Sequence, residues 1–338
     1  MLRRFRLVLV SMVLSFVLLS GPASAVTLRL ATLATEGMSW MKTFNRMNDE
    51  VIEKTGGQVK FKVYPGGVQG SDADVLRKVR SGLLNGGTFT AGGASEILRD
   101  LQIPSLPFLF RGYDEVDYVM ERLGPRFEAE LAEQGFVVLA WLETGFAYMM
   151  SQKPIASLED LKGRNVWIPE GDPISRCIFE TAGVPPIQLS LPDVLTALQS
   201  GLLDTVANSA VGTIVLQWHT KVGHLTDKPL IYAFGVLMVD AKTFGKVPKQ
   251  YQPLVKETVA RYFKGIKAQI RKDNAEAMDT LRGEGIKFIS LTDEHARELL
   301  VLAEKVKSKL VGKVYSAETL ALLESYLAEY RKAGKGAE

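Results

Sequence analysis

The sequence predicts an α/β protein built from two lobes. From residue 26 onward, strand-like and helical segments alternate, with strands expected at 27–31 and 59–64 and helices at 40–54 and 72–83. This alternation is typical of α/β folds and predicts a largely parallel sheet. The chain has 338 residues, 46% apolar and 23% charged, so it is long enough for two domains with a core each.

The first lobe is expected to cover residues 26–148, with part of 235–338 packed on it. Residues 104–110 are apolar but interrupted by prolines, which predicts a buried irregular segment and not a central strand. The segments expected after it are helices at 113–123 and 125–134 and a strand at 136–141.

The second lobe is expected to cover residues 149–234, with part of the C-terminal helical region. A helix should begin at Pro173, because proline suits the first helical position and Asp172 before it is a good N-cap. The other segments expected are a helical turn at 157–160, strands at 165–168, 205–207 and 229–239, and a helix at 192–200.

Residues 249–338 are expected to be helical and to pack on both lobes, with an interruption at 283–289. The stretch 250–282 is longer than a typical globular helix. We therefore expect it to bridge the two lobes, with the chain passing between them more than once.

Residues 1–25 have the pattern of a signal peptide. Arginines open the segment, an apolar run over residues 7–19 follows, and Ala23-Ser24-Ala25 supplies the small residues of a cleavage site. The apolar run is shorter than the roughly 20 residues that a membrane span needs. We expect the mature chain to start near Val26 and to be located in the periplasm.

Cleavage changes the charge balance. The full sequence has 41 basic and 38 acidic residues, and removing Arg3, Arg4 and Arg6 leaves 38 of each. A protein that binds the phosphates of nucleic acid is clearly basic, so nucleic acid is excluded as a partner. A strongly anionic membrane surface is excluded for the same reason.

No cofactor or metal motif is present. The sequence has no glycine-rich dinucleotide fingerprint after a strand, no P-loop and no nucleophile elbow. His219 and His224 are five residues apart, not the four that place two ligands on one helical face, and Cys177 fits a small buried hydrophobe. The sequence predicts a protein without cofactor or metal.

A periplasmic hydrolase or isomerase is a remote alternative. Glu143, Glu170 and Asp172 could supply acid and base groups, but no set of base and nucleophile accompanies them. We therefore expect that the protein is not an enzyme.

Aromatic residues near the expected element ends suggest a cleft for a small molecule. Aromatic side chains from two lobes can hold a ligand by stacking and burial. The candidates are Trp40, Trp141, Phe146, Tyr148, Trp167, Trp218 and Phe234.

Several motifs occur together in a characteristic order. They are Thr55-Gly56-Gly57-Gln58-Val59, Tyr64-Pro65-Gly66-Gly67, the run from Ser105 to Arg111, Asp160-Leu161-Lys162-Gly163, and the run from Ala197 to Asp204 followed by Asn208. In this order and spacing, the mature chain resembles the solute receptors of tripartite ATP-independent periplasmic (TRAP) transporters, in the dicarboxylate-receptor-like family.

The resemblance implies a type II-like periplasmic binding protein with crossing hinge strands and a long helix that bridges the lobes. It also implies a receptor that closes over one solute and delivers it to the membrane subunits of a TRAP permease, without a cofactor. A receptor for a sensor kinase and a carrier of lipid-like molecules stay open as alternatives, and a homodimer stays open as the assembly.

The sequence departs from the family where the ligand carboxylate is usually held by arginine. Alignment on Lys162-Gly163 places Trp167 at the first arginine position and Ala147 at the second, while Asn208 is retained. Arg164 lies on the other face of the expected strand.

We therefore expect a ligand that is less acidic and more aromatic or apolar than is usual in the family. Arg176, on the helix that Asp172 caps, is the only obvious candidate nearby that could bind a carboxylate instead. If the ligand is a cation over the aromatic rings, Glu36 or Glu143 would be its counter-charge.

Overall fold

The computed structural model describes residues 25–36 and 39–334. The predicted signal peptide therefore lies outside the described residues, apart from Ala25. In the described ranges, no helix combines the length and the apolar character that crossing a membrane requires.

Ten strands are found in the described chain, and eight of them form one mixed sheet in the order β2-β1-β3-β9-β4-β8-β10, with β7 also paired to β4. β5 and β6 form a separate pair. The strands are β1 (Val26–Ala31), β2 (Val59–Tyr64), β3 (Gly86–Thr90), β4 (Phe136–Ser151), β5 (Trp167–Pro169), β6 (Ile187–Leu189), β7 (Thr205–Asn208), β8 (His224–Thr226), β9 (Ile231–Asp240) and β10 (Lys287–Ile289).

The expectation of a largely parallel sheet is wrong. β1 is parallel to β2 and β3, as the alternation of strand and helix in the first 90 residues indicates. However, β4 runs antiparallel to β7, β8 and β9, and β3 runs antiparallel to β9. The long strands β4 and β9 come from later parts of the chain. The alternation of strands and helices in the N-terminal segment therefore could not predict their direction in the sheet.

The helices enclose this sheet. They are α2 (Ser39–Lys54), α3 (Asp72–Arg80), α4 (Ala91–Ala94), α5 (Tyr113–Glu133), α6 (Pro173–Thr181), α7 (Val194–Ser200), α8 (Ala210–Val215), α9 (Ala241–Phe244), α10 (Gln252–Gly283), α11 (Asp293–Leu310) and α12 (Ala317–Lys332). Short 3-10 helices are η1 (Arg99–Ser105), η2 (Glu159–Leu161), η3 (Leu191–Asp193) and η4 (Trp218–Lys221).

Several elements differ from the prediction, and α5 and β3 are two of them. The two helices expected at 113–123 and 125–134 are one helix, α5, with Pro125 inside it. Proline removes one helical hydrogen bond, and Glu121, whose carbonyl would accept it, lies at the exposed surface. β3 is not among the strands that the sequence predicts, and its glycines Gly86 and Gly87 have a low propensity for strands. A Cβ on Gly86 would lie 2.2 Å from the Met238 carbonyl oxygen, so this position needs glycine for close strand approach.

The long strand β4 joins the two parts of the sheet. Its first part pairs with β9, and its last residues pair with β7 and β8. At the bulge before Gly145 the backbone φ is +104°, and a Cβ there would lie 2.7 Å from Asn274 Nδ2. A glycine therefore permits the strand to bend where it passes under α10.

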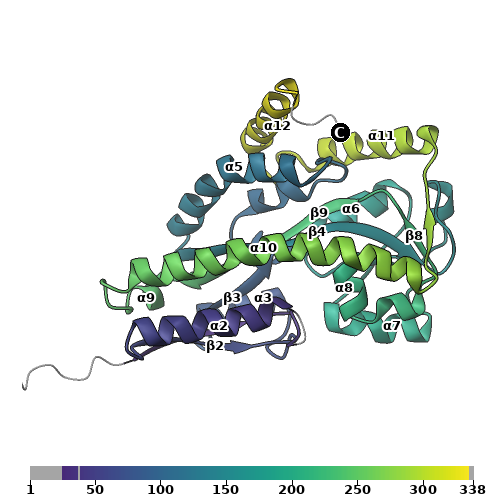
Figure 1. Cartoon of the computed structure of the whole chain (residues 1–338). Coiled ribbons are helices and arrows are strands. Elements are labelled where there is room, and N and C mark those ends of the chain that lie inside the picture. The colour runs from purple at the N-terminus through teal and green to yellow at the C-terminus, as the bar shows by residue number, and fades with distance from the viewer. Residues whose placement is uncertain (1–24, 37–38, 335–338) are drawn as a thin grey trace, which may run out of the picture.

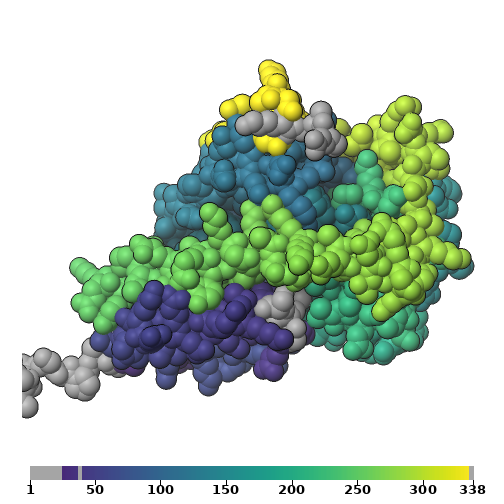
Figure 2. Space-filling view, viewed as in Figure 1, coloured from purple at the N-terminus to yellow at the C-terminus, as the bar shows by residue number. Residues whose placement is uncertain are grey.

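Helix α10 crosses the width of the molecule, with α2 below one end and α7 and α8 below the other (Figure 1). Figure 2 shows the same helix lying over both groups as a continuous ridge. Tyr262 Oη donates to Glu50 of α2 at 2.8 Å. Asn274 Nδ2 donates to the Thr144 carbonyl of β4 at 3.0 Å, and its Oδ1 accepts from Val211 N of α8 at 3.2 Å. The predicted long helix thus contacts both sides of the fold.

Candidate ligand-binding cleft

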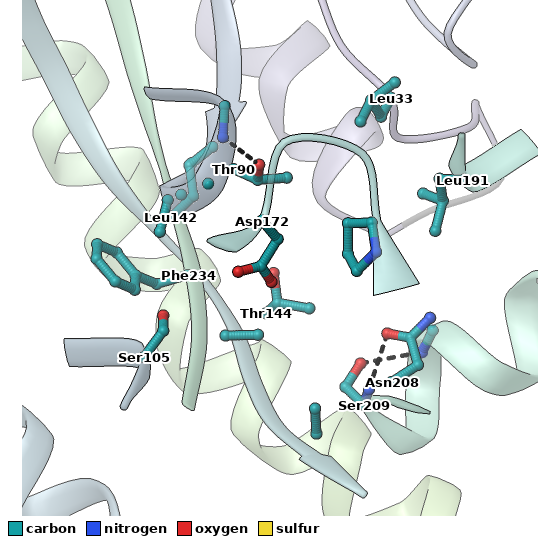
Figure 3. Close-up of a pocket in the computed structure, with 18 of the residues that line it drawn as sticks. Leu33, Thr90, Ser105, Leu142, Thr144, Asp172, Leu191, Asn208, Ser209 and Phe234 are labelled. Carbon is teal, nitrogen blue, oxygen red and sulfur yellow. Dashed lines mark hydrogen bonds between the residues drawn. The ribbon is translucent and has the colours of Figure 1, made fainter. Parts of the chain in front are cut away.

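A cavity of about 550 Å³ lies between two groups of elements. The first side of the cleft is formed by the loop after β1 and by β3, α2, α3 and α4, and the second side by β5, β7, α6 and α8. β4, β9 and α10 supply the rest of the wall. Figure 3 shows residues from both sides around this space, among them Thr90 on the first side and Asp172, Leu191 and Asn208 on the second.

The two sides of the cleft touch each other at two places. A Cβ on Gly92 would lie 3.7 Å from Cβ of Asp172, and a Cβ on Gly67 would lie 3.2 Å from Cγ of Pro192. Gly67 also has a φ of +72°, which favours glycine. These contacts bring the first and second sides together beside the cavity.

Most of the wall is apolar. The aromatic and aliphatic residues that line it include Trp40, Phe89, Phe179, Phe234, Phe263, Ile266 and Ile270. They come from elements that are far apart in sequence. Such a cavity suits a ligand with an aromatic or aliphatic body.

Trp167 lies on the cavity wall and is also part of the core of the second side. Its side chain is only 4% exposed, and its Nε1 donates to the Leu189 carbonyl at 3.0 Å. Its ring packs edge-to-face on Trp218 at 5.1 Å between centroids. Trp218 is 1% exposed and does not line the cavity, so its role is to support Trp167.

Strand alternation separates the candidates on β4. Ala147 lines the cavity, whereas its neighbours Phe146 and Tyr148 do not. The Phe146 ring packs against Tyr113 at 4.9 Å between centroids. Successive side chains of a strand point to opposite faces. Phe146 and Tyr148 therefore lie on the face opposite to Ala147 and the cavity.

The other aromatic candidates lie on the wall. Trp40 and Phe234 line the cavity, and so does Trp141. The Trp141 indole Nε1 donates to Glu128 of α5 at 2.9 Å, which directs that edge of the ring away toward the helix.

Asn208 is placed on the wall by β7, next to the start of α8. Its Oδ1 accepts from Ser209 N at 2.8 Å (Figure 3). Ser209 caps α8 by accepting from Gly212 N at 3.2 Å. A Cβ on Gly212 would lie 2.6 Å from Asn208 Oδ1, so glycine leaves room for the amide.

Two charged candidates lie away from the wall. Arg176 is on the outer side of α6, where its Nη2 donates to Gln188 at 2.5 Å and its Nη1 lies 3.5 Å from Glu180. Glu36 is exposed and does not line the cavity. The sequence could not distinguish the outer from the inner face of α6 because the Asp172 cap fixes only where the helix begins.

Glu143 lines the cavity but its charge is already paired. Arg271 donates to its two oxygens at 2.7 and 2.8 Å, and Tyr232 Oη donates to it at 3.0 Å. Burial and the Glu143 carboxylate raise the pKa of Tyr232 well above its usual value. Arg271 also binds Asp117 of α5, and although burial acts to lower the arginine pKa, its pairing with Glu143 and Asp117 raises it.

Two further acids on the wall are held by neutral donors. Asp172 Oδ1 accepts from Ile174 N and Ser175 N at 3.0 and 3.1 Å, as an N-cap does, and burial raises the pKa of its carboxyl group. Asp72 Oδ2 accepts from Thr90 N at 3.0 Å and from Thr90 Oγ1 at 2.7 Å. Burial raises the pKa of Asp72 to about 6.

Sequence reasoning did not find Asp72 or Gln102 as wall residues. Asp72 looked like an ordinary acid in the first turn of a helix, and its contact with Thr90 depends on a strand that was not expected. Gln102 lies in η1, next to the segment predicted to be irregular and buried. No group of three or more potential metal ligands occurs within residues 25–36 and 39–334.

The family of the chain follows from sequence comparison. The sequence model of the bacterial extracellular solute-binding proteins, family 7 (DctP), matches residues 30–311. A solute-binding protein of Verminephrobacter eiseniae is 24% identical over 283 residues, which cover 83% of this chain and 84% of the relative. Another, from Chromohalobacter salexigens, is 30% identical over 170 residues, 50% of each chain.

Solved structures confirm the two-lobed α/β fold. A TRAP periplasmic solute-binding protein of Ralstonia eutropha with bound (S)-2-acetolactate has a TM-score of 0.83 at 24% identity, over 90% of this chain and 99% of that chain. One from Desulfovibrio salexigens with bound orotic acid has a TM-score of 0.83 at 19% identity, with the same coverage. Because the sequence model spans most of the chain, the predicted family is confirmed: this chain belongs to the bacterial extracellular solute-binding proteins of family 7, as its resemblance to the TRAP solute receptors indicates.

Proposed function

We propose that this protein is a periplasmic receptor that captures a small organic molecule in the cleft and delivers it to the membrane subunits of a TRAP permease. Membership of family 7 supports the class of function, and the cavity between the two sides of the cleft supports the place of binding. The receptor works by binding and release, without turnover of its ligand. The signal-peptide pattern of residues 1–25 supports export to the periplasm.

One observation carries the proposal on ligand character. Trp167 and Ala147, the positions where the family resemblance implies arginines, both line the cavity, and no arginine occurs among its described wall residues. A buried carboxylate without a cationic partner is costly. The proposed ligand is therefore less acidic and more aromatic or apolar than the galacturonate or orotic acid named for similar structures.

The proposed mechanism is closure of the two sides over the ligand. A ligand that contacts Trp40 on the first side and Trp167 on the second stabilises the closed form more than the open one. β4 and α10 connect the two sides, so bending of these elements would be the hinge. The Gly92–Asp172 and Gly67–Pro192 contacts would separate on opening.

Two measurements test the proposal. Native mass spectrometry of protein purified from the periplasm without refolding should detect a bound small molecule that is chemically unchanged on release. Titration of intrinsic tryptophan fluorescence should then show binding of that molecule, because three of the four tryptophans, Trp40, Trp141 and Trp167, line the cavity. Succinate and malate should produce no change.

Tight binding of small dicarboxylates, with no binding of aromatic or aliphatic compounds, would contradict the proposed ligand character. Transport is tested separately by uptake of the identified ligand in cells that lack the gene. Unchanged uptake would contradict the permease partner and favour a receptor for a sensor kinase or a carrier.

A further inference from the structure

The cavity wall is rich in acids and poor in bases. Its described acidic residues are Asp72, Glu96, Glu143, Glu170, Asp172 and Asp273. Lys267 is the one basic residue of the described wall, and it forms an ion pair with Asp117, which does not line the cavity. Glu143 is paired with Arg271. The described wall therefore holds more acidic than basic residues.

Asp72 and Asp172 approach this space from opposite sides, one from α3 and one from the start of α6. Neither forms an ion pair with any residue in the described part of the chain, and the groups that donate to them are backbone N–H groups and hydroxyls of Thr90 and Ser175. The nearby charge that acts on Asp72 is that of Glu96, another acid. Both carboxyl groups therefore lack a counter-cation. In Figure 3 the Asp172 carboxylate is directed among Thr90, Phe234 and Thr144.

An independent feature on the same wall also requires a hydrogen-bond donor. Gln102 is 2% exposed and lines the cavity. Its Nε2 donates to Ser95 Oγ, and the Ser95 hydroxyl donates to the Gly92 carbonyl at 2.6 Å. Because that hydroxyl hydrogen is used, Ser95 Oγ can only accept from Gln102, which fixes the orientation of the amide.

The consequence is that Gln102 Oε1 is a buried acceptor that no group in the described ranges reaches. A buried carbonyl oxygen without a donor is costly and rare. Because Gln102 lines the cavity, we take a ligand bound there as the source of that donor. The chemical class of the ligand can be inferred from Gln102 Oε1, the carboxyl groups of Asp72 and Asp172, and the apolar wall.

We infer that the solute is an organic cation: one or more protonated nitrogen groups on an aromatic or aliphatic body, with N–H groups donated to Asp72, Asp172 and Gln102 Oε1. This inference rests on the proposed function, since it concerns the occupant of the same cleft. The ammonium or guanidinium group supplies the missing counter-charge, and rings such as Trp40 and Phe234 cover the body. Glu36 and Glu143, which the sequence suggested as counter-charges, are replaced in this role by Asp72 and Asp172.

The pKa values of Asp72 and Asp172 are consistent with carboxyl groups that have no counter-cation. Burial raises the pKa of both Asp72 and Asp172, and for Asp72 the value reaches about 6. A bound cation favours the ionised carboxylate and so lowers both pKa values. Cation binding should therefore tighten as the pH rises through about 6.

The test uses probes that share a body and differ in one group. Phenethylamine, phenethyl alcohol and hydrocinnamate form one such set, and tryptamine, tryptophol and indolepropionate form another. Thermal shift and calorimetry on the mature protein should show binding by the amines only. Binding by a carboxylate or an alcohol in preference to the matching amine overturns the inference, and so does failure of every amine to bind.

Single-residue variants test whether Asp172 and Gln102 bind the amine. Asp172→Asn keeps an N-cap of equal quality, and Gln102→Leu removes the unpartnered oxygen. Each should weaken amine binding about tenfold or more, the scale of one hydrogen bond to a charged group. Glu180→Gln on the outer face of α6 is the matched control and should bind normally. Equal affinity in both cavity variants would overturn the assignment.

The outcomes separate this inference from the proposed function. Preferential binding of a carboxylate would leave a solute receptor in place and remove only its cation selectivity. A co-purified molecule that is released chemically altered would instead contradict the receptor function itself.

Discussion

The indole of Trp167 packs edge-to-face on Trp218, with 5.1 Å between ring centroids and 77° between ring planes. Trp167 lines the ligand cavity, whereas Trp218 lies behind it at 1% exposure. The same ring therefore contributes both to the binding surface and to the core that supports β5. This double role decides how a mutation at residue 167 must be designed.

Trp167→Ala should destabilise the protein by roughly 3–5 kcal/mol, because it removes a large buried ring. Loss of binding in that variant would not separate a direct contact from unfolding. Trp167→Phe keeps a ring and removes the bond to the Leu189 carbonyl, so we expect about 1 kcal/mol of destabilisation. Chemical denaturation monitored by circular dichroism measures both. Trp141→Phe, which loses a hydrogen bond to the exposed Glu128, is the control, and a larger loss there than at 167 would contradict the prediction.

Glu143→Gln should strongly destabilise the fold. The Glu143 side chain is 2% exposed and is paired with Arg271, so the variant leaves a partly buried guanidinium with one carboxylate fewer. Removing one partner of a buried pair costs roughly 3–5 kcal/mol. Asp279→Asn on the same helix, α10, breaks an ion pair that is exposed on both sides and should change the unfolding free energy little. Similar values for the two variants would show that Glu143 is not a structural anchor.

Asp72 should make the stability depend on pH. Its pKa is about 6 in the folded protein, against the value of 3.8 that is usual for an aspartate in an unfolded chain. Between these values the folded state binds more protons, so the free energy of unfolding contributed by Asp72 falls as the pH rises through this window. Asp72→Asn should therefore gain stability relative to the parent from pH 4 to above pH 6.

Asp74 on the same helix provides a control of opposite sign. Hydrogen bonds from Ser71 lower the pKa of Asp74, so its contribution to stability is present at neutral pH and is lost in acid. Asp74→Asn should lose stability relative to the parent as the pH rises. Thermal unfolding of both variants across the pH range checks the two slopes, and parallel slopes would rule out the assignment for Asp72.

Asn208→Ala should weaken ligand binding by about 1 kcal/mol or more if its amide pairs with a polar group of the ligand. Calorimetry with the co-purified molecule measures the change. Arg176→Ala is the control, because this arginine lies outside the cavity wall and pairs with Gln188 and Glu180. A loss of affinity at Arg176 with none at Asn208 would reverse the two roles.

A large part of the fold could be predicted from the sequence, because local residue patterns determine where many of its strands and helices lie. The alternating run at residues 59–64 is β2, and the Asp172 cap begins α6 at Pro173. The unusually long apolar periodicity near residues 250–282 is α10, which contacts both sides of the cleft. The order of the family motifs indicated the family without any structural information.

Within the candidate site, the sequence separated wall residues from their neighbours only in part. Trp167 and Ala147 could be placed by counting from a motif, but strand alternation put Phe146 and Tyr148 elsewhere. Arg176 could not be placed because helix spacing alone does not show which face is covered by neighbouring elements.

What the sequence determined by itself is the set of local elements, their caps and the family to which their order belongs. The tertiary structure alone decided which charges are satisfied. Glu143 meets Arg271 across 128 residues of chain, whereas Asp72 and Asp172 meet only neutral donors. The physical reason is that a buried charge depends on partners brought together by folding, and sequence spacing does not record those distances.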